Sequence, residues 1–263
     1  MNSLRPKTIA EIREELSSAN KEEFEALKRA LAADDRKGVR TLLSSAQKRI
    51  DAEAAEAARL DGMYAFQDEI AHGGTVVGLD EVGRGPVAGP LTVGAVVLSP
   101  QPCIANLNDS KQLSPSVRES VAAAVKETAV AWHIEHVSPA DIDDNGMAWA
   151  LKTAFSRALA AIEAQGIKPD VVLIDGNPLH IDPREVNVVK GDAKCASIAA
   201  ASVIAKVERD ALMEEMGKKY PGYAFEKSKG YASPEHIAAI KDHGLTPIHR
   251  ATFCTSFIQE SLF

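Results

Sequence analysis

Hydrophobic residues are spaced in two different ways along the chain, and the change falls near residue 73. In the first part, apolar residues recur every three or four positions among Ala, Leu, Glu, Lys and Arg, as in Ile9, Ile12 and Leu16. This spacing and composition predict a few amphipathic helices. We expect the region of Gly62 to end the last of them.

Beyond His72-Gly73-Gly74 the pattern changes to short β-branched runs separated by glycine turns. The runs predict strands near 75–80, 91–98, 130–137, 171–175 and 186–189. Helical spacing predicts helices near 115–129, 147–165, 193–216 and 233–243. Together they predict an α/β fold, a mixed sheet flanked by helices. The alanine-rich helix at 193–216 is expected to pack closely on the sheet. We expect a helical N-terminal extension at 1–72 and an α/β domain at 73–263 with a helical C-terminal region.

Composition narrows the class of protein. The 263 residues, 45% of them hydrophobic, suffice for one large core or a core with a small appended domain. The longest apolar runs are far shorter than a membrane span, and the charged N-terminus does not resemble a secretory signal, so we expect a cytoplasmic protein. The cysteines, Cys103, Cys195 and Cys254, lie too far apart for a zinc motif or a disulfide framework. No sustained heptad pattern is present, and we expect a monomer.

The charge is uneven along the chain. A formal net charge of -7 argues against a nucleic-acid partner if it is taken alone. Between residues 218 and 250, however, basic residues and histidines outnumber acidic residues; the basic ones are Lys218, Lys219, Lys227, Lys229, Lys241 and Arg250. A local basic surface is therefore expected on an acidic protein.

The segment GLDEVGRGPVAGP, residues 78–90, brings Asp80 and Glu81 from an apolar strand directly into a glycine-rich turn. Carboxylates at this place are costly unless they are solvated, paired or bound to a cation. Neighbouring strand residues point to opposite faces, so we expect a bend or bulge near Val82-Gly83 to bring both acids to one site. An ordinary turn is the alternative. A phosphate-binding P-loop is excluded because Arg84-Gly85 stands where that motif requires Lys-Ser/Thr.

Two further acids occupy the ends of predicted elements. Asp175 follows the strand VVLI, where α/β folds commonly build sites, although a turn-forming aspartate would look the same. Asp192 precedes the alanine-rich helix and is expected to be its N-cap, which would leave one oxygen free to face a site. Carboxylates without a nearby Cys or His pair favour Mg²⁺ or Mn²⁺. We expect a two-metal site for phosphoryl chemistry, formed by Asp80, Glu81, Asp175 and Asp192.

Downstream, EKSKGYASPEH and HRATF place lysines, Tyr231, His249 and Arg250 near one another in sequence. Lysines can contact phosphates and an exposed aromatic ring can stack, as a nucleic-acid groove requires. A solvated loop is the alternative for the lysines.

Several motifs in the same order resemble ribonuclease HII from about residue 75 to about residue 257. They are GLDEVGRGPVAGP, LNDSKQLS, VVLIDGN, VVKGDAKCASIAAASVIAKVERD, FEKSKGYASPEH and HRATF. The resemblance implies a ribonuclease H-like fold in which the four acids match the family's metal-binding and catalytic positions. It also implies that Gly83, Arg84 and Gly85 meet the ribonucleotide at an RNA-to-DNA junction, that Tyr231 stacks on the next sugar, and that Lys111 and Lys229 contact phosphates.

Enzymes of this family cut RNA/DNA hybrids and incise duplex DNA on the 5' side of an embedded ribonucleotide, leaving a 3'-hydroxyl and a 5'-phosphate. The resemblance therefore implies the same substrates here, and links the chain to DNA repair and replication. Two alternatives remain: a ribonuclease HIII-like specificity for hybrids, although that type has Glu where this chain has Asp192, and a hybrid-binding module without catalysis. The resemblance assigns no role to residues 1–72, for which we expect a protein partner as one possibility.

Overall fold

The computed structural model describes residues 7–258, which fall into two units, divided between Arg59 and Leu60. The first unit contains α1 (Ile9–Ser18), α2 (Lys21–Ala30) and the beginning of α3 (Lys37–Ala71). Capping boxes start α1 and α2, and each satisfies backbone N–H groups that the helix itself cannot pair. The amphipathic helices predicted for this region are confirmed; their buried faces meet in a core of Ile12, Leu16, Ala19, Phe24, Val39, Ala46 and Ile50.

The expectation that a helix ends near Gly62 is wrong. Helix α3 continues without a break to Ala71, because Leu60, Met63 and Tyr64 are buried in the second unit and their packing outweighs the cost of about 1 kcal/mol for one helical glycine. The boundary expected at residue 72 coincides with the end of α3. The last turns of this helix belong to the second unit.

The second unit is built on a mixed sheet, as the sequence predicts. Its strands are β1 (Val76–Val82), β2 (Leu91–Val97), β3 (Ala131–Val137), β4 (Val171–Asp175) and β5 (Glu185–Val188). The spatial order is β3-β2-β1-β4-β5. Strand β2 runs antiparallel to both β1 and β3, whereas β1, β4 and β5 are parallel. The carboxyl ends of the inner strands β1 and β4 therefore lie side by side at one end of the sheet.

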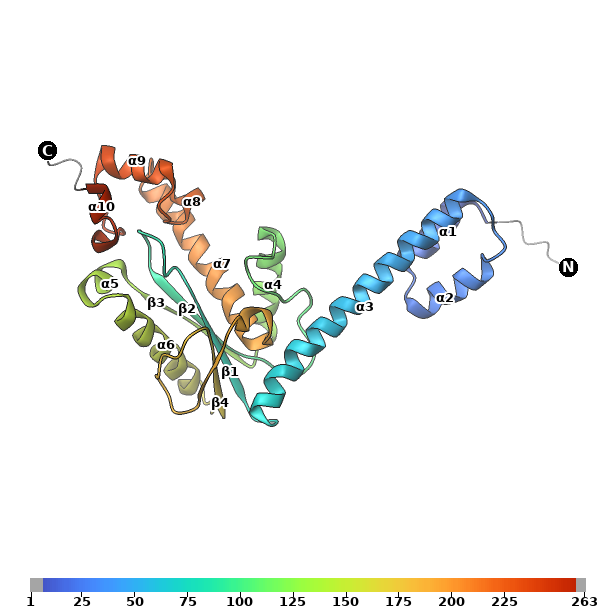
Figure 1. Ribbon diagram of the computed structural model, residues 1–263, viewed down its shortest axis with the longest axis horizontal. Helices are drawn as coiled ribbons and strands as arrows, with labels where there is room; N and C mark the ends of the chain where they lie inside the picture. The colour runs from blue at the N-terminus through green and yellow to red at the C-terminus, as the bar shows by residue number, and fades with distance from the viewer. Residues whose placement is uncertain (1–6, 259–263) are drawn as a thin grey trace. The chain divides into compact units, whose positions relative to one another are not determined.

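Helices cover both faces of the sheet (Figure 1). Helix α6 (Met147–Ala164) packs on one face with the help of Val77 and Leu79. Helix α7 (Ala196–Lys219) covers the other face, and α4 (Pro115–Thr128) packs against α7. The remaining helical segments are α5 (Pro139–Asn145), η1 (Gly191–Ala193), α8 (Phe225–Ser228), α9 (Pro234–His243), η2 (Ala251–Phe253) and α10 (Thr255–Ile258). The helical C-terminal region is thus confirmed.

The close packing expected for the alanine-rich helix is also confirmed, and two strand glycines make it possible. A Cβ atom on Gly78 would lie 2.3 Å from the backbone carbon of Ser197, and a Cβ on Gly94 would lie 2.3 Å from the carbonyl oxygen of Ala201. The backbone of α7 therefore rests directly on β1 and β2. No helix within residues 7–258 is both long and apolar enough to cross a membrane.

Candidate active site

Asp80 and Glu81 lie near the carboxyl end of β1 and point to opposite faces of the sheet. The ladder between β1 and β2 is regular through this point, with Asp80 opposite Gly94 and Glu81 opposite Val93. The bulge expected near Val82-Gly83 is therefore wrong: the strand keeps its alternation. Asp80 is buried on the α7 side, and its Oδ1 accepts a hydrogen bond of 2.8 Å from the backbone N–H of Glu81.

Asp175 lies between the acids of β1 and the η1 turn that carries Asp192. It ends β4, the parallel neighbour of β1. Its Oδ1 accepts a 2.6 Å hydrogen bond from the backbone N–H of Gly191. A Cβ atom at Gly191 would lie 3.3 Å from this oxygen and 2.6 Å from Ile198 Cδ1, so a side chain here would disturb the turn. The hydrogen bond holds the η1 turn, which carries Asp192, against the end of β4.

Asp192 does not cap the long helix, contrary to the sequence-based expectation. It lies inside η1, whereas α7 begins at Ala196 with Cys195 in the cap position and no side-chain cap. The intervening turn frees the Asp192 carboxylate from the helix end. Lys111 approaches this carboxylate, with Nζ 3.9 Å from Oδ2, while the lysine side chain remains 80% exposed.

The electrostatics of the site link all four carboxylates. Burial raises the pKa of Asp80 well above its usual value, and the charges of Glu81 and Asp175 raise it further. Burial also raises the pKa of Glu81, with Asp175 adding to the effect and Arg84 opposing it. Burial raises the pKa of Asp192, assisted by the charge of Asp175. Asp175 thus lies close enough to the other three acids to repel each of them.

These acids suit a divalent cation in chemistry and charge. All the donors are carboxylate oxygens, the ligands that Mg²⁺ and Mn²⁺ prefer, and their mutual repulsion is what a bound cation would offset. Among residues 7–258, no three His, Cys, Asp or Glu side chains already meet in the arrangement of an assembled metal site. The fit therefore rests on the donor set and on its unfavourable charge.

Sequence reasoning missed two side chains beside these acids. The buried hydroxyl of Ser202 on α7 hydrogen-bonds Asp80 and lies 3.0 Å from the hydroxyl of Ser110. Asp109 is a further carboxylate, whose charge raises the pKa values of Asp192 and Lys111. Asp109 belongs to the NDSK segment, which was singled out in sequence only for Lys111. An acid in the same motif could have been recognised there. Nothing in the sequence distinguishes Ser202 from the other small residues of α7.

The glycine-rich loop between β1 and β2, residues 83–90, lies beside the loop that carries Tyr231. Gly85 is open to solvent, and a Cβ atom placed on it would meet Cε1 of Tyr231 at 3.6 Å. The tyrosine side chain is exposed. Arg84 has its guanidinium 4.0 Å from Oε1 of Glu81 and is also exposed. The structure therefore brings Gly83, Arg84, Gly85 and Tyr231 next to the carboxyl end of β1.

A chain of hydrogen bonds fixes the backbone at Tyr231. The Thr246 N–H donates to Nδ1 of His249 at 2.9 Å, the Nε2 atoms of His249 and His236 lie 3.0 Å apart, and Nδ1 of His236 lies 2.8 Å from the Tyr231 carbonyl oxygen. Neutral imidazoles satisfy every member, with His249 donating to His236 and His236 donating to the carbonyl. Burial lowers the pKa of both histidines, and that of His249, also lowered by His236, falls to about 4.

The basic surface expected from residues 218–250 is only partly present. His249 and Arg250 are buried and cannot take part in it, because the fold turns these two side chains inward behind the glycine-rich loop. The ammonium of Lys229 lies 2.6 Å from Oε1 of Glu214, and its side chain is 17% exposed. A phosphate contact by Lys229 would therefore compete with this ion pair.

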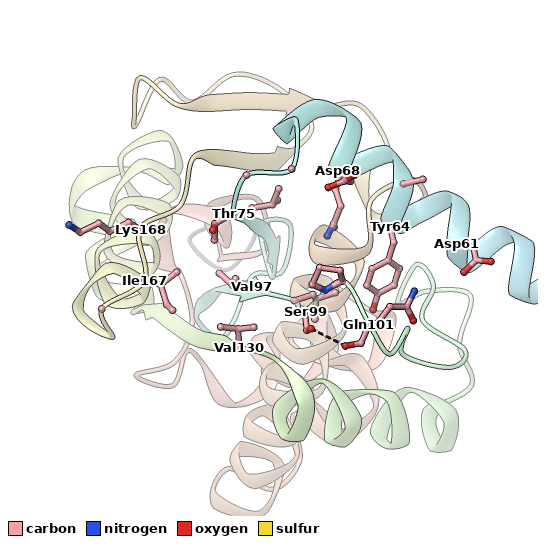
Figure 2. A pocket seen from close by; sticks show the side chains of 18 residues that line it. Asp61, Tyr64, Asp68, Thr75, Val97, Ser99, Gln101, Val130, Ile167 and Lys168 are labelled. Atoms are coloured by element: carbon pink, nitrogen blue, oxygen red, sulfur yellow. Dashed lines mark hydrogen bonds between the residues drawn. The ribbon is translucent and has the colours of Figure 1, made fainter.

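A cavity of about 680 Å³ lies away from the carboxylates, at the opposite ends of the strands. Figure 2 shows Tyr64 and Asp68 of α3 on one side of it and Ile167 and Lys168 on the other. A groove of about 510 Å³ does adjoin the acids, and both Glu81 and Asp175 line it. The groove at the carboxyl ends of β1 and β4 is therefore lined by two of the four acids, whereas the first cavity is lined by none.

Comparison with known proteins identifies the family. The family model described as Ribonuclease HII matches residues 77–256, and that described as Ribonuclease HII N-terminal domain matches residues 8–71. The ribonuclease HII of Levilactobacillus brevis is 42% identical over 225 residues, which cover 85% of this chain and 86% of that protein.

Two solved structures share the fold. The ribonuclease H2 from Pyrococcus horikoshii OT3 has a TM-score of 0.61 at 28% identity and covers 71% of this chain and 98% of its own. Bst ribonuclease HIII in complex with Mn²⁺ has a TM-score of 0.60 at 19% identity and covers 73% of this chain and 72% of its own. The ribonuclease H-like fold is thereby confirmed, and the chain belongs to the ribonuclease HII family of ribonuclease H endonucleases.

Proposed function

We propose that this endoribonuclease hydrolyses the RNA strand of RNA/DNA hybrids and incises duplex DNA on the 5' side of single embedded ribonucleotides, leaving a 3'-hydroxyl and a 5'-phosphate. The observation that supports the proposal most directly is the position of the glycine-rich loop. This loop begins after Val82, one residue beyond Asp80 and Glu81, and lies against Tyr231. The groups proposed to recognise the ribose, the glycine-rich loop and Tyr231, are therefore adjacent to the acids proposed for phosphodiester hydrolysis.

We assign the four carboxylates, Asp80, Glu81, Asp175 and Asp192, to the binding of two Mg²⁺ or Mn²⁺ ions. When bound, such ions activate a water and stabilise the leaving oxygen of an in-line displacement. The residues themselves fix the geometry: Ser202 and the N–H of Glu81 orient Asp80, and the N–H of Gly191 orients Asp175. Lys111 has an exposed ammonium beside Asp192 and is suited to a phosphate next to the site.

The glycine-rich loop and Tyr231 supply the discrimination between RNA and DNA. Gly85 presents backbone without a side chain, which lets a 2'-hydroxyl approach, and this hydroxyl is what separates the two nucleic acids. The exposed ring of Tyr231 offers an apolar surface to the neighbouring sugar. Residues 1–72 are left without a part in these steps, and their binding of a protein partner stays a prediction.

The test is cleavage of an end-labelled DNA duplex that contains one ribonucleotide, compared with an all-DNA duplex and with an RNA/DNA hybrid of the same sequence. We expect one cut on the 5' side of the ribonucleotide with Mg²⁺ or Mn²⁺, no cut in the all-DNA duplex, and no cut after chelation. The Asp80→Asn variant should bind the duplex without cutting it. Cleavage of the hybrid alone would support a HIII-like specificity, and binding without cleavage of any substrate would contradict the proposal.

A further inference from the structure

Two fully buried arginines, Arg209 on α7 and Arg250 before η2, lie behind the glycine-rich loop. Among residues 7–258, neither guanidinium forms an ion pair within 4.0 Å, unlike the arginines that do so at the surface. Their N–H groups go to backbone carbonyls instead. A buried cation is costly, and one without a carboxylate partner must be held by closely fitted hydrogen bonds.

Arg250 donates hydrogen bonds to the carbonyl groups of the glycine-rich loop from its buried side. Its Nη2 donates to Gly83 O at 2.6 Å and to Gly89 O at 2.8 Å. Its Nη1 donates to Pro86 O at 2.8 Å and to Arg84 O at 3.2 Å. The loop needs such a donor, because its prolines have no N–H and its tight turns leave carbonyls without backbone partners.

Arg209 joins the same loop to the loop of Tyr231. Its Nε donates to Pro90 O at 3.0 Å and its Nη2 to Ala88 O at 3.1 Å, while its Nη1 donates to Lys229 O at 2.9 Å. One rigid guanidinium plane therefore spans both segments. It also explains a glycine: at Gly83, with φ +91°, a Cβ atom would lie 2.2 Å from Arg209 Nε.

Backbone contacts complete the connection between the loops. The N–H groups of Val87 and Ala88 both donate to Gly230 O, at 2.9 and 3.2 Å. Burial lowers the pKa of Arg250 to about 10, and the charge of Arg209 adds to the effect. Arg250 therefore remains protonated at neutral pH and keeps the full set of donors that the carbonyls require.

We propose that Arg209 and Arg250 are positioning residues for ribonucleotide recognition, which set the distance between the glycine-rich loop and Tyr231. The inference rests on the proposed function and adds to it the groups that fix the glycine-rich loop and Tyr231 relative to each other. Neither arginine contacts the substrate. A displacement of about 1 Å in a catalytic geometry can cost about 100-fold in rate, so small shifts of these loops would be visible in cleavage.

Substrates differ in their sensitivity to such a shift. A hybrid carries a 2'-hydroxyl at every position of its RNA strand, so a displaced glycine-rich loop can still engage one of them. A duplex with a single ribonucleotide offers one hydroxyl in one register. Loss of either arginine should therefore reduce cleavage at the single ribonucleotide more than cleavage of the hybrid.

The experiment compares kcat/KM on these two substrates for full-length wild type, Arg209→Lys and Arg250→Lys, well below each protein's unfolding temperature. Lysine keeps the charge but lacks the planar fork of donors. We expect the preference for the single ribonucleotide to fall at least about tenfold, within the range expected for such displacements. Arg184→Lys is the matched control, since Arg184 also donates to a backbone carbonyl, that of Pro169, but at the opposite ends of the strands. Its preference should not change.

Gly230→Ala tests the same distance without removing a buried charge. Its Cβ would lie 2.2 Å from Ala88 O and would force the loops apart, whereas Gly166, with the same φ of +86°, has nothing within 4 Å and serves as its control. Gly230→Ala should lose the preference and Gly166→Ala should keep it. A folded set of Arg209, Arg250 and Gly230 variants with the wild-type preference would overturn this inference alone. A wild type that shows no dependence on the 2'-hydroxyl would overturn the proposed function as well.

Discussion

The contact between α7 and β2 leads to a quantitative prediction for Gly94→Ala. In the wild type, the position of the missing Cβ is 2.3 Å from the carbonyl oxygen of Ala201 and 3.2 Å from its Cα. Ordinary contacts of a Cβ begin near 3.4 Å, so the helix backbone must withdraw by about 1 Å, which amounts to overpacking a close-packed interior. A helix held on both sides cannot yield as a flexible side chain can.

We expect this substitution to lower the free energy of unfolding by about 3 kcal/mol, the upper end of typical overpacking costs. For a unit of this size the unfolding midpoint should fall by about 6–12 °C. Cleavage should fall too, because Ser202, which hydrogen-bonds Asp80, follows Ala201 on the displaced helix. Thermal unfolding followed by circular dichroism or calorimetry measures the first effect, and the duplex assay measures the second.

Gly62→Ala is the matched control for the glycine substitution. This glycine is exposed on α3, and a Cβ atom added to it would have nothing within 4 Å, so alanine should stabilise the helix by up to about 1 kcal/mol. An unfolding midpoint of Gly94→Ala equal to that of the wild type would refute the direct contact between α7 and β2. A loss of stability in Gly62→Ala would refute the continuous helix.

Three further predictions concern charge. Asp175→Asn should abolish cleavage and, without metal, raise the unfolding midpoint at neutral pH, because it removes the charge that repels the other acids; a lower midpoint would contradict this. As pH falls from about 6.5 to about 4, stability should decrease by up to about 3 kcal/mol, because the unfolded chain protonates His249 while the folded chain excludes the proton. Denaturant titrations should show this slope in wild type and a smaller slope in His249→Gln, where His236 alone of the pair remains with a lowered pKa. Glu214→Gln should free Lys229 from its ion pair and steepen the salt dependence of duplex binding by about one phosphate contact; an unchanged slope would exclude Lys229 from the interface.

The sequence by itself closely determined the strands and the four longer helices of the second unit, but it did not predict the short helices α5 and α8. Strand β4 and helix α6, for example, lie within one residue of their predicted bounds, because β4 is a short continuous apolar run and the apolar residues of α6 recur at helical spacing. The small residues of α7, together with Gly78 and Gly94 of the strands, also determined its close approach to the sheet. Asp80, Glu81 and Asp175 could be singled out because strand ends place carboxylates where burial is costly.

Other features depended on packing between distant segments, and only the tertiary structure decided them. Helix α3 continues past Gly62 because the second unit buries Met63 and Tyr64, which outweighs the local preference of glycine. Asp192 is free of the helix end because the N–H of Gly191 binds Asp175, far away in sequence. No local pattern records such partners.

The buried arginines show the same limit most clearly. In sequence, Arg250 lies in a basic segment and is expected at the surface, since arginine is rarely buried without a partner. Its partners are the carbonyl groups of Gly83 and Gly89, and these converge only after the chain has folded. The sequence determined which residues could carry the chemistry, while the fold decided which of them gather at the carboxyl ends of β1 and β4 and which hold the others in place, because burial and hydrogen bonding are properties of the assembled chain.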